Sequence, residues 1–469
     1  TFDSERLLLS LKALGPILPQ VNVFGRQLGV SPGVMGMVTG VLPLLWAAAK
    51  PSFGYIVDYF TNQRKLIFMS LIALMTISHC CLWFLPKPIA TETLIEEHIY
   101  RLNNTVYIKH INNTTDEKND SFKIVDVTNT ALVNGESLTK TSLSAKDTNE
   151  RSFYASSTFW GYVVFMCIGA VAFNVANCIG DAVCFNVLGP DRGNKYGYQR
   201  AWGTAGYGIT ALVGGWLVDV ASKGHIKDFT PAFILAIVFT VFDIIACRTL
   251  KLPKLSSPSD SGEALKNILK LPRVLIFIIF AMIIGIFDSF IIYYMFWYLE
   301  ELAESTGHMD SIKLLEGIIV AAQSLGELFF FFFSGKILKR WGHGITMTFC
   351  LFCYGVRLAL VSFITHPWHL VFIEIIMQGP TYALCYATIV GYAAEVAPEG
   401  YSATVQGIVA GMDDGIGFSL GSVLGGVLYS YLGGCDSFRL MALIALLTSF
   451  IHALLHKVIH NRTEQDEGK

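Results

Sequence analysis

The chain has 469 residues, of which 53% are hydrophobic and only 15% are charged. A water-soluble fold of this length carries more charge and could not bury so much apolar surface, so the composition excludes an ordinary soluble domain and favours a protein embedded in lipid. The net charge of −2 also excludes the strongly basic balance that is typical of nucleic-acid binding.

Twelve mostly apolar segments follow one another along the chain. Each is close to the ~20 residues that an α-helix needs to cross a bilayer. We therefore predict an all-α membrane protein with twelve transmembrane helices. The predicted spans are 5–28, 32–56, 64–86, 157–188, 200–222, 230–250, 273–298, 311–334, 345–365, 369–393, 401–431 and 437–457.

A long polar stretch, 87–156, separates the third and fourth predicted spans. It is rich in Asn, Thr, Ser and Asp, and it carries glycosylation acceptor sites at Asn103, Asn112, Asn113 and Asn119. Glycosylation occurs on the luminal or extracellular side, whereas Lys and Arg concentrate in the short loops on the other side of the predicted spans. Both features predict an extracytoplasmic, glycosylated loop and cytoplasmic termini, in the plasma membrane or an endomembrane.

Two sequence features recur in the two halves of the chain. A basic turn that begins with glycine follows the second span (Gly54, Asp58, Arg64) and again the eighth (Gly335, Arg340). The glycine-rich fifth and eleventh spans fall into the same register once the loop is removed. We therefore predict two parallel six-helix repeats. The expected parts are an N-terminal half, 1–250, with the loop inside it, a cytoplasmic linker, 251–272, a C-terminal half, 273–457, and a cytoplasmic tail, 458–469.

The turn after the second span resembles the signature of the major facilitator superfamily, although its basic residues come about two positions late. The sequence Gln199-Arg200-Ala-Trp202-Gly203, with Gln378-Gly379 and Val405-Gln406-Gly407, resembles more closely the animal major facilitator superfamily domain-containing protein 6 group. The resemblance implies the major facilitator fold and a solute carrier, with spans one, four, seven and ten around a central cavity. It also implies gating by the two basic turns and by Asp181, at the end of the fourth span.

Ionisable residues inside a membrane span are costly, so each is a functional candidate. Five of them lie near the centres of their predicted spans and are candidates for proton coupling; the alternative is a structural ion-pair network. They are Asp288, Glu327, Arg357, Asp413 and Asp414. Lys50, near the cytoplasmic end of the second span, is expected to pair with Asp58 or to extend its amine towards the surface.

Polar side chains also follow helical spacing on the spans assigned to the cavity. Positions three or four residues apart share one helix face. Amides, carboxylates and aromatic rings on such faces suit a polar solute with hydroxyl or amine groups, although the tyrosines could equally be core aromatics. The candidate substrate-binding residues are Gln20, Asn22, Asn174, Asn177, Asp288, Tyr293, Tyr294, Gln378, Tyr382 and Tyr386.

Glycines crowd the fifth and eleventh predicted spans. Because small residues let helix backbones approach closely, we predict that these glycines form the contact at which the two halves slide. They are Gly203, Gly206, Gly214, Gly215, Gly407, Gly411, Gly415, Gly425 and Gly426.

We predict a secondary active transporter of a small polar solute, with protons as the candidate coupling ion. The alternative is a non-transporting receptor or scaffold that acts through loop 87–156. The sequence has no phosphate-binding loop, catalytic-triad pattern or His-rich metal cluster. Cys350 and Cys353 have the spacing of a zinc or redox pair, but they lie inside a predicted span without a second pair. We therefore expect no enzyme activity, cofactor or metal. The expected partners are the solute, protons and the lipid bilayer, but not nucleic acid, and we expect a monomer.

Overall fold

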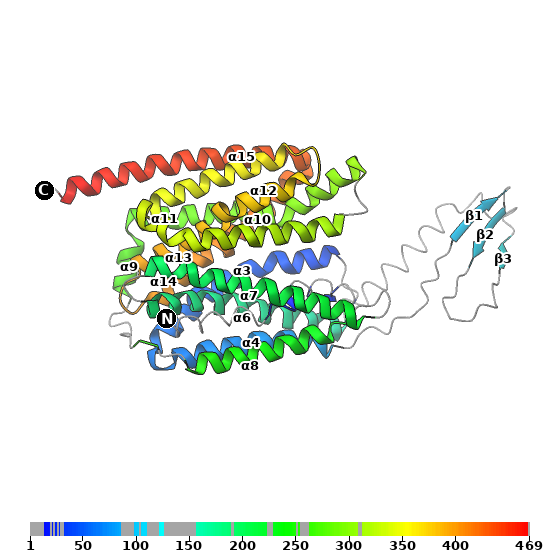
Figure 1. The fold of residues 1–469 in the computed structure, drawn as a ribbon, viewed down its shortest axis with the longest axis horizontal. Coiled ribbons are helices and arrows are strands. Elements are labelled where there is room, and N and C mark those ends of the chain that lie inside the picture. Colours follow the sequence, from blue (N-terminus) through cyan, green and yellow to red (C-terminus); the bar gives the residue numbers. More distant parts are fainter. Residues whose placement is uncertain are drawn as a thin grey trace.

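A computed structural model describes residues 14–18, 21, 24–25, 28, 32–85, 98–102, 105–109, 122–125, 156–188, 192–222, 228–249, 252–253, 262–307 and 312–467. Long helices run side by side in one bundle (Figure 1). Helix α9 lies at one end of this bundle, and a small β-sheet lies beyond the other end (Figure 1). These two ends are named the α9 end and the sheet end.

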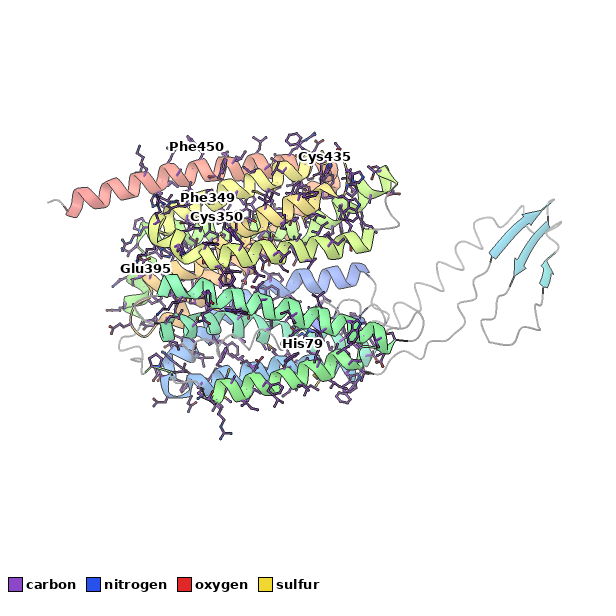
Figure 2. The ribbon with its side chains drawn as sticks, in the orientation of Figure 1. His79, Phe349, Cys350, Glu395, Cys435 and Phe450 are labelled. Atoms are coloured by element: carbon purple, nitrogen blue, oxygen red, sulfur yellow. The ribbon has the colours of Figure 1, made fainter. Side chains whose placement is uncertain are left out.

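The first group of helices comes from the N-terminal part of the chain. Buried apolar side chains such as Ile72, Tyr162 and Val175 pack between these helices in one core cluster. His79 also lies in this group (Figure 2), where its ring packs against Gly169. The elements are α3 (Pro32–Tyr59), the single 3-10 turn η3 (Thr61–Gln63), α4 (Arg64–Trp83), α6 (Ser157–Leu188), α7 (Arg192–Ala221) and α8 (Thr230–Thr249).

The second group comes from the C-terminal part and has its own core cluster, which includes Phe287, Cys350 and Phe438. Figure 2 shows Cys350 among these helices, away from His79. The short helix α9 lies within the segment predicted as the linker. The elements are α9 (Glu263–Leu269), α10 (Pro272–Thr306), α11 (Ile312–Ser362), α12 (His369–Gln378), η6 (Gly379–Ala383), α13 (Leu384–Val396), α14 (Ser402–Ala410), η7 (Gly411–Gly417) and α15 (Phe418–Glu467).

Two of these helices contain a sharp kink at a glycine. The backbone of α11 turns at Gly342, where φ is 73°, and that of α15 turns at Gly433, where φ is 74°. A positive φ is readily adopted only by glycine. Each kink falls between two predicted spans, so α11 and α15 each contain two consecutive helices that run in opposite directions.

The bundle has the surface of a membrane protein. Within the described residues, eight helices are long and apolar enough to cross a bilayer. Leu212, Phe372 and Phe450 point outwards with 75%, 68% and 62% of their surface exposed, and Figure 2 shows Phe450 on the outer side of α15. Such widespread apolar exposure is expected against lipid rather than water. Helix α7 is not among the eight, because polar residues on its inner face lower its hydropathy.

A three-stranded antiparallel sheet lies within the loop predicted at 87–156. The strands are β1 (His98–Leu102), β2 (Thr105–Lys109) and β3 (Phe122–Val125), in the order β1-β2-β3. Pairs such as Ile99 with Ile108 and Tyr107 with Ile124 face each other across the ladder. Aromatic and β-branched residues favour strands, which explains why these segments form a sheet. The sheet is a small addition to the expected all-α architecture. The predicted acceptor sites Asn103, Asn112, Asn113 and Asn119 lie outside the described residues.

Candidate functional site

A cavity of about 580 Å³ lies between the two groups of helices. Helices α3, α6 and α7 line it from the first group. Helices α10 and α11, the end of α12 with η6 and α13, the segment α14–η7 and the start of α15 line it from the second. Its volume is in the range of roughly 300–1,000 Å³ that is typical of small-molecule sites.

Most of the predicted substrate residues line this cavity. Tyr293 and Tyr294 are not among the lining residues, and the Tyr294 hydroxyl instead donates a hydrogen bond to the carbonyl oxygen of Ser422, at 2.6 Å, where α10 packs against α15. Gln20 and Asn22 lie outside the described residues. The structure brings together Asn174, Asn177, Asp288, Gln378, Tyr382 and Tyr386.

All of the residues predicted to couple protons line the cavity: Asp288, Glu327, Arg357, Asp413 and Asp414. The Tyr354 hydroxyl donates to Oδ1 of Asp288 at 3.2 Å, and Nε2 of Gln378 donates to Oε1 of Glu327 at 2.9 Å. Among the described residues, no cation lies within ion-pair distance of Asp288, Glu327 or Asp413.

Arg357 forms a buried ion pair with Glu374, from the outer part of the predicted tenth span. Nε of Arg357 donates to Oε1 of Glu374 at 3.0 Å, and Nη2 donates to Oε2. The two side chains are 1% and 0% exposed. Nη1 of Arg357 donates to the hydroxyl of Thr381 at 2.7 Å, and Gln323 donates to Glu374. Such a fully partnered pair fits the structural alternative for Arg357.

Lys50 pairs with Asp414, and both predicted roles for Lys50 are wrong. Its amine contacts both carboxylate oxygens of Asp414, and the side chain is 2% exposed, so it neither reaches Asp58 nor extends to the surface. The indole of Trp46 fixes the same segment by donating to the carbonyl oxygen of Asp414 at 2.8 Å. Helix α3 turns Lys50 inwards because it packs closely against α14 and η7.

Two π-helical segments lie at the cavity. η6 begins directly after Gln378 and contains Tyr382, whereas η7 contains both Asp413 and Asp414. A π turn inserts a residue into the helical repeat and is frequent at functional sites. In η7 it accompanies two consecutive carboxylates that both line the cavity.

Asp181 lies at the centre of a cluster that joins the two groups of helices. It accepts hydrogen bonds from the hydroxyl of Tyr196 at 2.9 Å and from that of Tyr386 at 2.5 Å. Arg200 lies 3.6 Å from Asp181, and its guanidinium is 4.7 Å from the ring centroid of Tyr386. Because Tyr386 comes from α13 and the other three from α6 and α7, the cluster bridges the groups. It is named the tyrosine–aspartate bridge.

Asp58 forms a second bridge, nearer the α9 end. Its carboxylate accepts hydrogen bonds from the backbone N–H groups of Ala403 at 3.2 Å and Thr404 at 2.7 Å, and from the Thr404 hydroxyl at 2.8 Å. Arg64 lies 3.4 Å from the same carboxylate. Asp58 therefore caps the N-terminus of α14, whose own N-cap residue, Tyr401, forms no side-chain cap.

The predicted gating residues of the other basic turn lie in α11, before its kink. Gly335 is buried and Arg340 is exposed. Gly54, by contrast, lies at the contact between the groups, since a Cβ there would come within 2.4 Å of the carbonyl oxygen of Ala403. Of the two similar turns, the one with Gly54 and Asp58 makes the bridge described above.

The predicted sliding contact is formed by only some of the glycines. A Cβ on Gly407 would lie 2.5 Å from the backbone of Lys50, and Gly411 and Gly415 pack equally closely on Ala47. Gly214 instead packs on Pro16, and Gly425 and Gly426 pack on Tyr294, each within its own group. For these three glycines the prediction was wrong. The spacing of glycines indicates that another helix packs closely against them, but it does not indicate which helix.

A second cavity, of about 260 Å³, lies on the α9 side of the tyrosine–aspartate bridge. Phe185, Tyr196, Leu338, Ala387 and Glu395 are among the side chains that line it. His343 Nδ1 is 2.9 Å from Oε2 of Glu395, which Figure 2 shows at the α9 end. Tyr196 thus contacts both the bridge and the second cavity.

Sequence reasoning missed several residues that the structure places at the site. The motif that contains Arg200 indicates the family but not a place in the cavity, and nothing in the sequence around Trp46 and Gln323 marks them as site residues. Arg200 could have been found, because it is a charge on a glycine-rich span. The aromatic lining residues could not, because phenylalanine and tryptophan are as common on lipid-facing surfaces.

A family model described as "MFS_1 like family" matches residues 6–440. Major facilitator superfamily domain-containing protein 6-like protein A of Xenopus laevis is 23% identical over 277 residues, which are 58% of this chain and 44% of that protein. The 6-like protein B of the same species matches over 24% of its length, so the chain spans less than half of these relatives.

Two further similarities extend to bacterial proteins. Xanthosine permease of Escherichia coli is 23% identical over 60% of this chain and 69% of its own length. The crystal structure of the nucleoside transporter NupG superimposes with a TM-score of 0.58 at 16% identity, and covers 97% of this chain and 98% of the other. The fold is therefore that of a solved membrane transporter.

Proposed function

The chain belongs to the MFS_1 like family, and on this premise we propose that it is a secondary active transporter that moves a small polar solute by alternating access. It is a multi-pass integral membrane protein and a transporter rather than an enzyme. One observation carries the proposal: a cavity that contains several charged side chains lies between two groups of helices, and polar bridges join these groups. Alternating access requires such a site at the interface of two repeats.

We assign the two groups to the two predicted six-helix repeats, 1–250 and 273–457. The core clusters support this division, because one lies wholly in the C-terminal half and the other lies mainly in the N-terminal half. The second of these also takes in Leu338, Ala387, Val390, Ala394 and Ala403, where the halves meet. Helices α11 and α15 each include residues of two predicted spans, and the kinks at Gly342 and Gly433 are the turns between those spans. In this arrangement both termini and α9 are cytoplasmic, and loop 87–156, with its acceptor sites, is extracytoplasmic.

The structure corresponds in this proposal to the state closed on the cytoplasmic side. The bridge from Asp58 to α14 and the tyrosine–aspartate bridge both join the halves between the cavity and the α9 end. Ser402 adds a hydrogen bond to Asn186, at 3.4 Å. Opening towards the cytoplasm would break these contacts and connect the cavity with the second cavity.

We assign proton coupling to carboxylates of the cavity, with Asp288 first. Asp288 is 6% exposed, and titratable groups of several elements act on it. They are Glu327, Tyr354 and Arg357 of α11, Glu374 of α12, Tyr382 of η6, Cys385 of α13, and Asp413 and Asp414 of η7. Because a buried carboxylate without a cation is stabilised by taking up a proton, protonation would remove a charge from the site as the halves move.

Transport is tested by uptake into proteoliposomes that contain the purified chain. The probes are radiolabelled xanthosine, uridine, fucose and phenethylammonium, each with and without an imposed pH gradient. We expect accumulation of at least one probe, stimulated by the gradient, and loss of that stimulation in Asp288→Asn. Uptake that ignores the gradient would reject coupling and leave facilitated diffusion. Uptake of no probe above that of empty vesicles would contradict the transporter.

The tyrosine–aspartate bridge gives a second prediction. Tyr386→Phe removes the hydroxyl that donates to Asp181 but keeps the ring beneath Arg200. Loss of a hydrogen bond to a charged group costs about 1.5–3 kcal/mol, which is roughly a tenfold or greater shift towards opening. We expect faster amide exchange at the start of α7, measured by mass spectrometry. Tyr392→Phe, outside the cavity, is the control. Equal exchange in the two variants would show that the tyrosine–aspartate bridge does not hold the halves together.

A further inference from the structure

The charges around the central cavity do not balance. Among the described residues three cations line it, and each already has a carboxylate of the protein as its partner. Lys50 pairs with Asp414, Arg200 with Asp181 and Arg357 with Glu374. Among the residues that the structure describes on this lining, no cation is therefore left to neutralise an anionic solute.

Three lining carboxylates remain without such a partner: Asp288, Glu327 and Asp413. Asp288 is more than nine-tenths buried, and only its Oδ1 receives a hydrogen bond, from Tyr354. Within the described part of the chain, its Oδ2 has no hydrogen-bond partner, although the side chain borders the cavity. A buried carboxylate oxygen is stable only when a donor or a cation meets it. The cavity is therefore short of positive charge at this position.

Aromatic rings form much of the remaining wall. Trp46, Tyr207, Phe296, Tyr382 and Phe418 come from α3, α7, α10, η6 and α15. Ring faces attract ammonium and guanidinium groups, most strongly where water is excluded. One ring of the cavity already does so, since the Arg200 guanidinium lies over Tyr386.

We propose that the solute of this transporter is a monovalent organic cation with an aromatic or alkyl body. Its ammonium group binds beside Asp288 and Asp413, which α10 and η7 hold close together, as the packing of Asp413 on Gly285 shows. Its body lies against the aromatic wall. This inference rests on the proposed function and specifies the substrate class of the same site.

A series of probes with one shape and three charges tests the inference. Phenethylammonium, 2-phenylethanol and phenylacetate share a phenyl ring on a short carbon chain and differ mainly in the charged group. Their binding to the full chain in lipid nanodiscs is measured by equilibrium dialysis, with uridine as a fourth, uncharged probe. We expect phenethylammonium to bind at least about tenfold more tightly than the other three, because it alone forms a desolvated charge pair with the site. Equal or tighter binding of phenylacetate, phenylethanol or uridine would overturn the proposal.

Two variants locate the charge within the cavity. Asp288→Asn and Asp413→Asn remove one negative charge each while keeping the size of the side chain. We expect each variant to weaken the binding of phenethylammonium at least about tenfold and to leave the weak binding of 2-phenylethanol unchanged. Asp436→Asn is the matched control, because Asp436 is exposed and pairs with Arg439 outside the cavity. Equal affinity in all three variants would refute the assignment, and the two cavity variants report independently if one of them fails to fold.

The outcome separates this inference from the proposed function. If phenethylammonium binds selectively but no probe is accumulated by the proteoliposomes, the cation-binding site stands and the transport proposal fails. If uridine or xanthosine is accumulated and phenethylammonium does not bind, transport stands and the cation inference fails.

Discussion

Replacing Arg357 by methionine is expected to lower the free energy of unfolding by about 3–5 kcal/mol, because removal of one partner leaves the other charge buried and unpaired. Glu374 is 0% exposed and would lose both of its hydrogen bonds from the guanidinium. Gln323 would remain as a donor to one oxygen, but an amide does not neutralise the charge. The midpoint of unfolding in a titration with denaturing detergent measures the change.

The double variant Arg357→Met with Glu374→Met separates a buried-charge penalty from a packing defect. Because it removes both charges together, we expect it to recover most of the lost stability. Arg439→Met is the control, since Arg439 pairs with Asp436 at the surface and exposed pairs contribute about 0–1 kcal/mol. If Arg357→Met cost no more than Arg439→Met, the pair would not be the buried, low-dielectric contact that the structure shows.

Replacing Asp58 by alanine is expected to loosen the closure at the α9 end. The substitution removes the acceptor for two backbone N–H groups at the start of α14 and the partner of Arg64. Loss of an N-cap costs about 0.5–2 kcal/mol, and loss of a negative charge at a helix N-terminus adds to that cost. We therefore expect the amides of Ala403 and Thr404 to exchange with solvent about tenfold faster.

Hydrogen–deuterium exchange of peptides from α14 measures this effect in the purified protein. Asp58→Asn keeps one acceptor oxygen and loses only the charge, so an intermediate rate is expected. Asp436→Asn, remote from α14, leaves the rate unchanged. Equal protection of α14 in Asp58→Ala and in the unmodified chain would show that the cap does not hold the halves together.

The helices themselves could be predicted because the hydrophobic signal is local. Lipid cannot hydrogen-bond a peptide group, so each span must be a continuous apolar helix that is visible in about 20 consecutive residues. The kinks at Gly342 and Gly433 fall where the predicted spans are separated. Helix α7 begins at Arg192, before its predicted start, because its first turns are polar and weaken the hydropathy that marks a span.

The site was predictable only as a set of residues and not as an arrangement. Intramembrane charges and polar positions spaced by three or four identified Asp288, Asn174, Asn177 and Tyr386, and these line the cavity. The same reasoning placed Tyr294 there, because a helical repeat states which residues share a face but not which face points inwards. Tyr294 instead packs where α10 meets α15.

The sequence by itself determined that the chain is a multi-pass membrane protein and which polar residues lie within its apolar segments. Only the tertiary structure decided which charges neutralise one another. Lys50 and Asp414 are 364 positions apart, and Asp181 and Tyr386 are 205 apart. The sequence shows that a helix carries a charge into the bilayer, but contacts between distant helices decide which partner offsets the cost of burying that charge. That pairing leaves Asp288, Glu327 and Asp413 without a cation at ion-pair distance in the part of the chain that the structure describes.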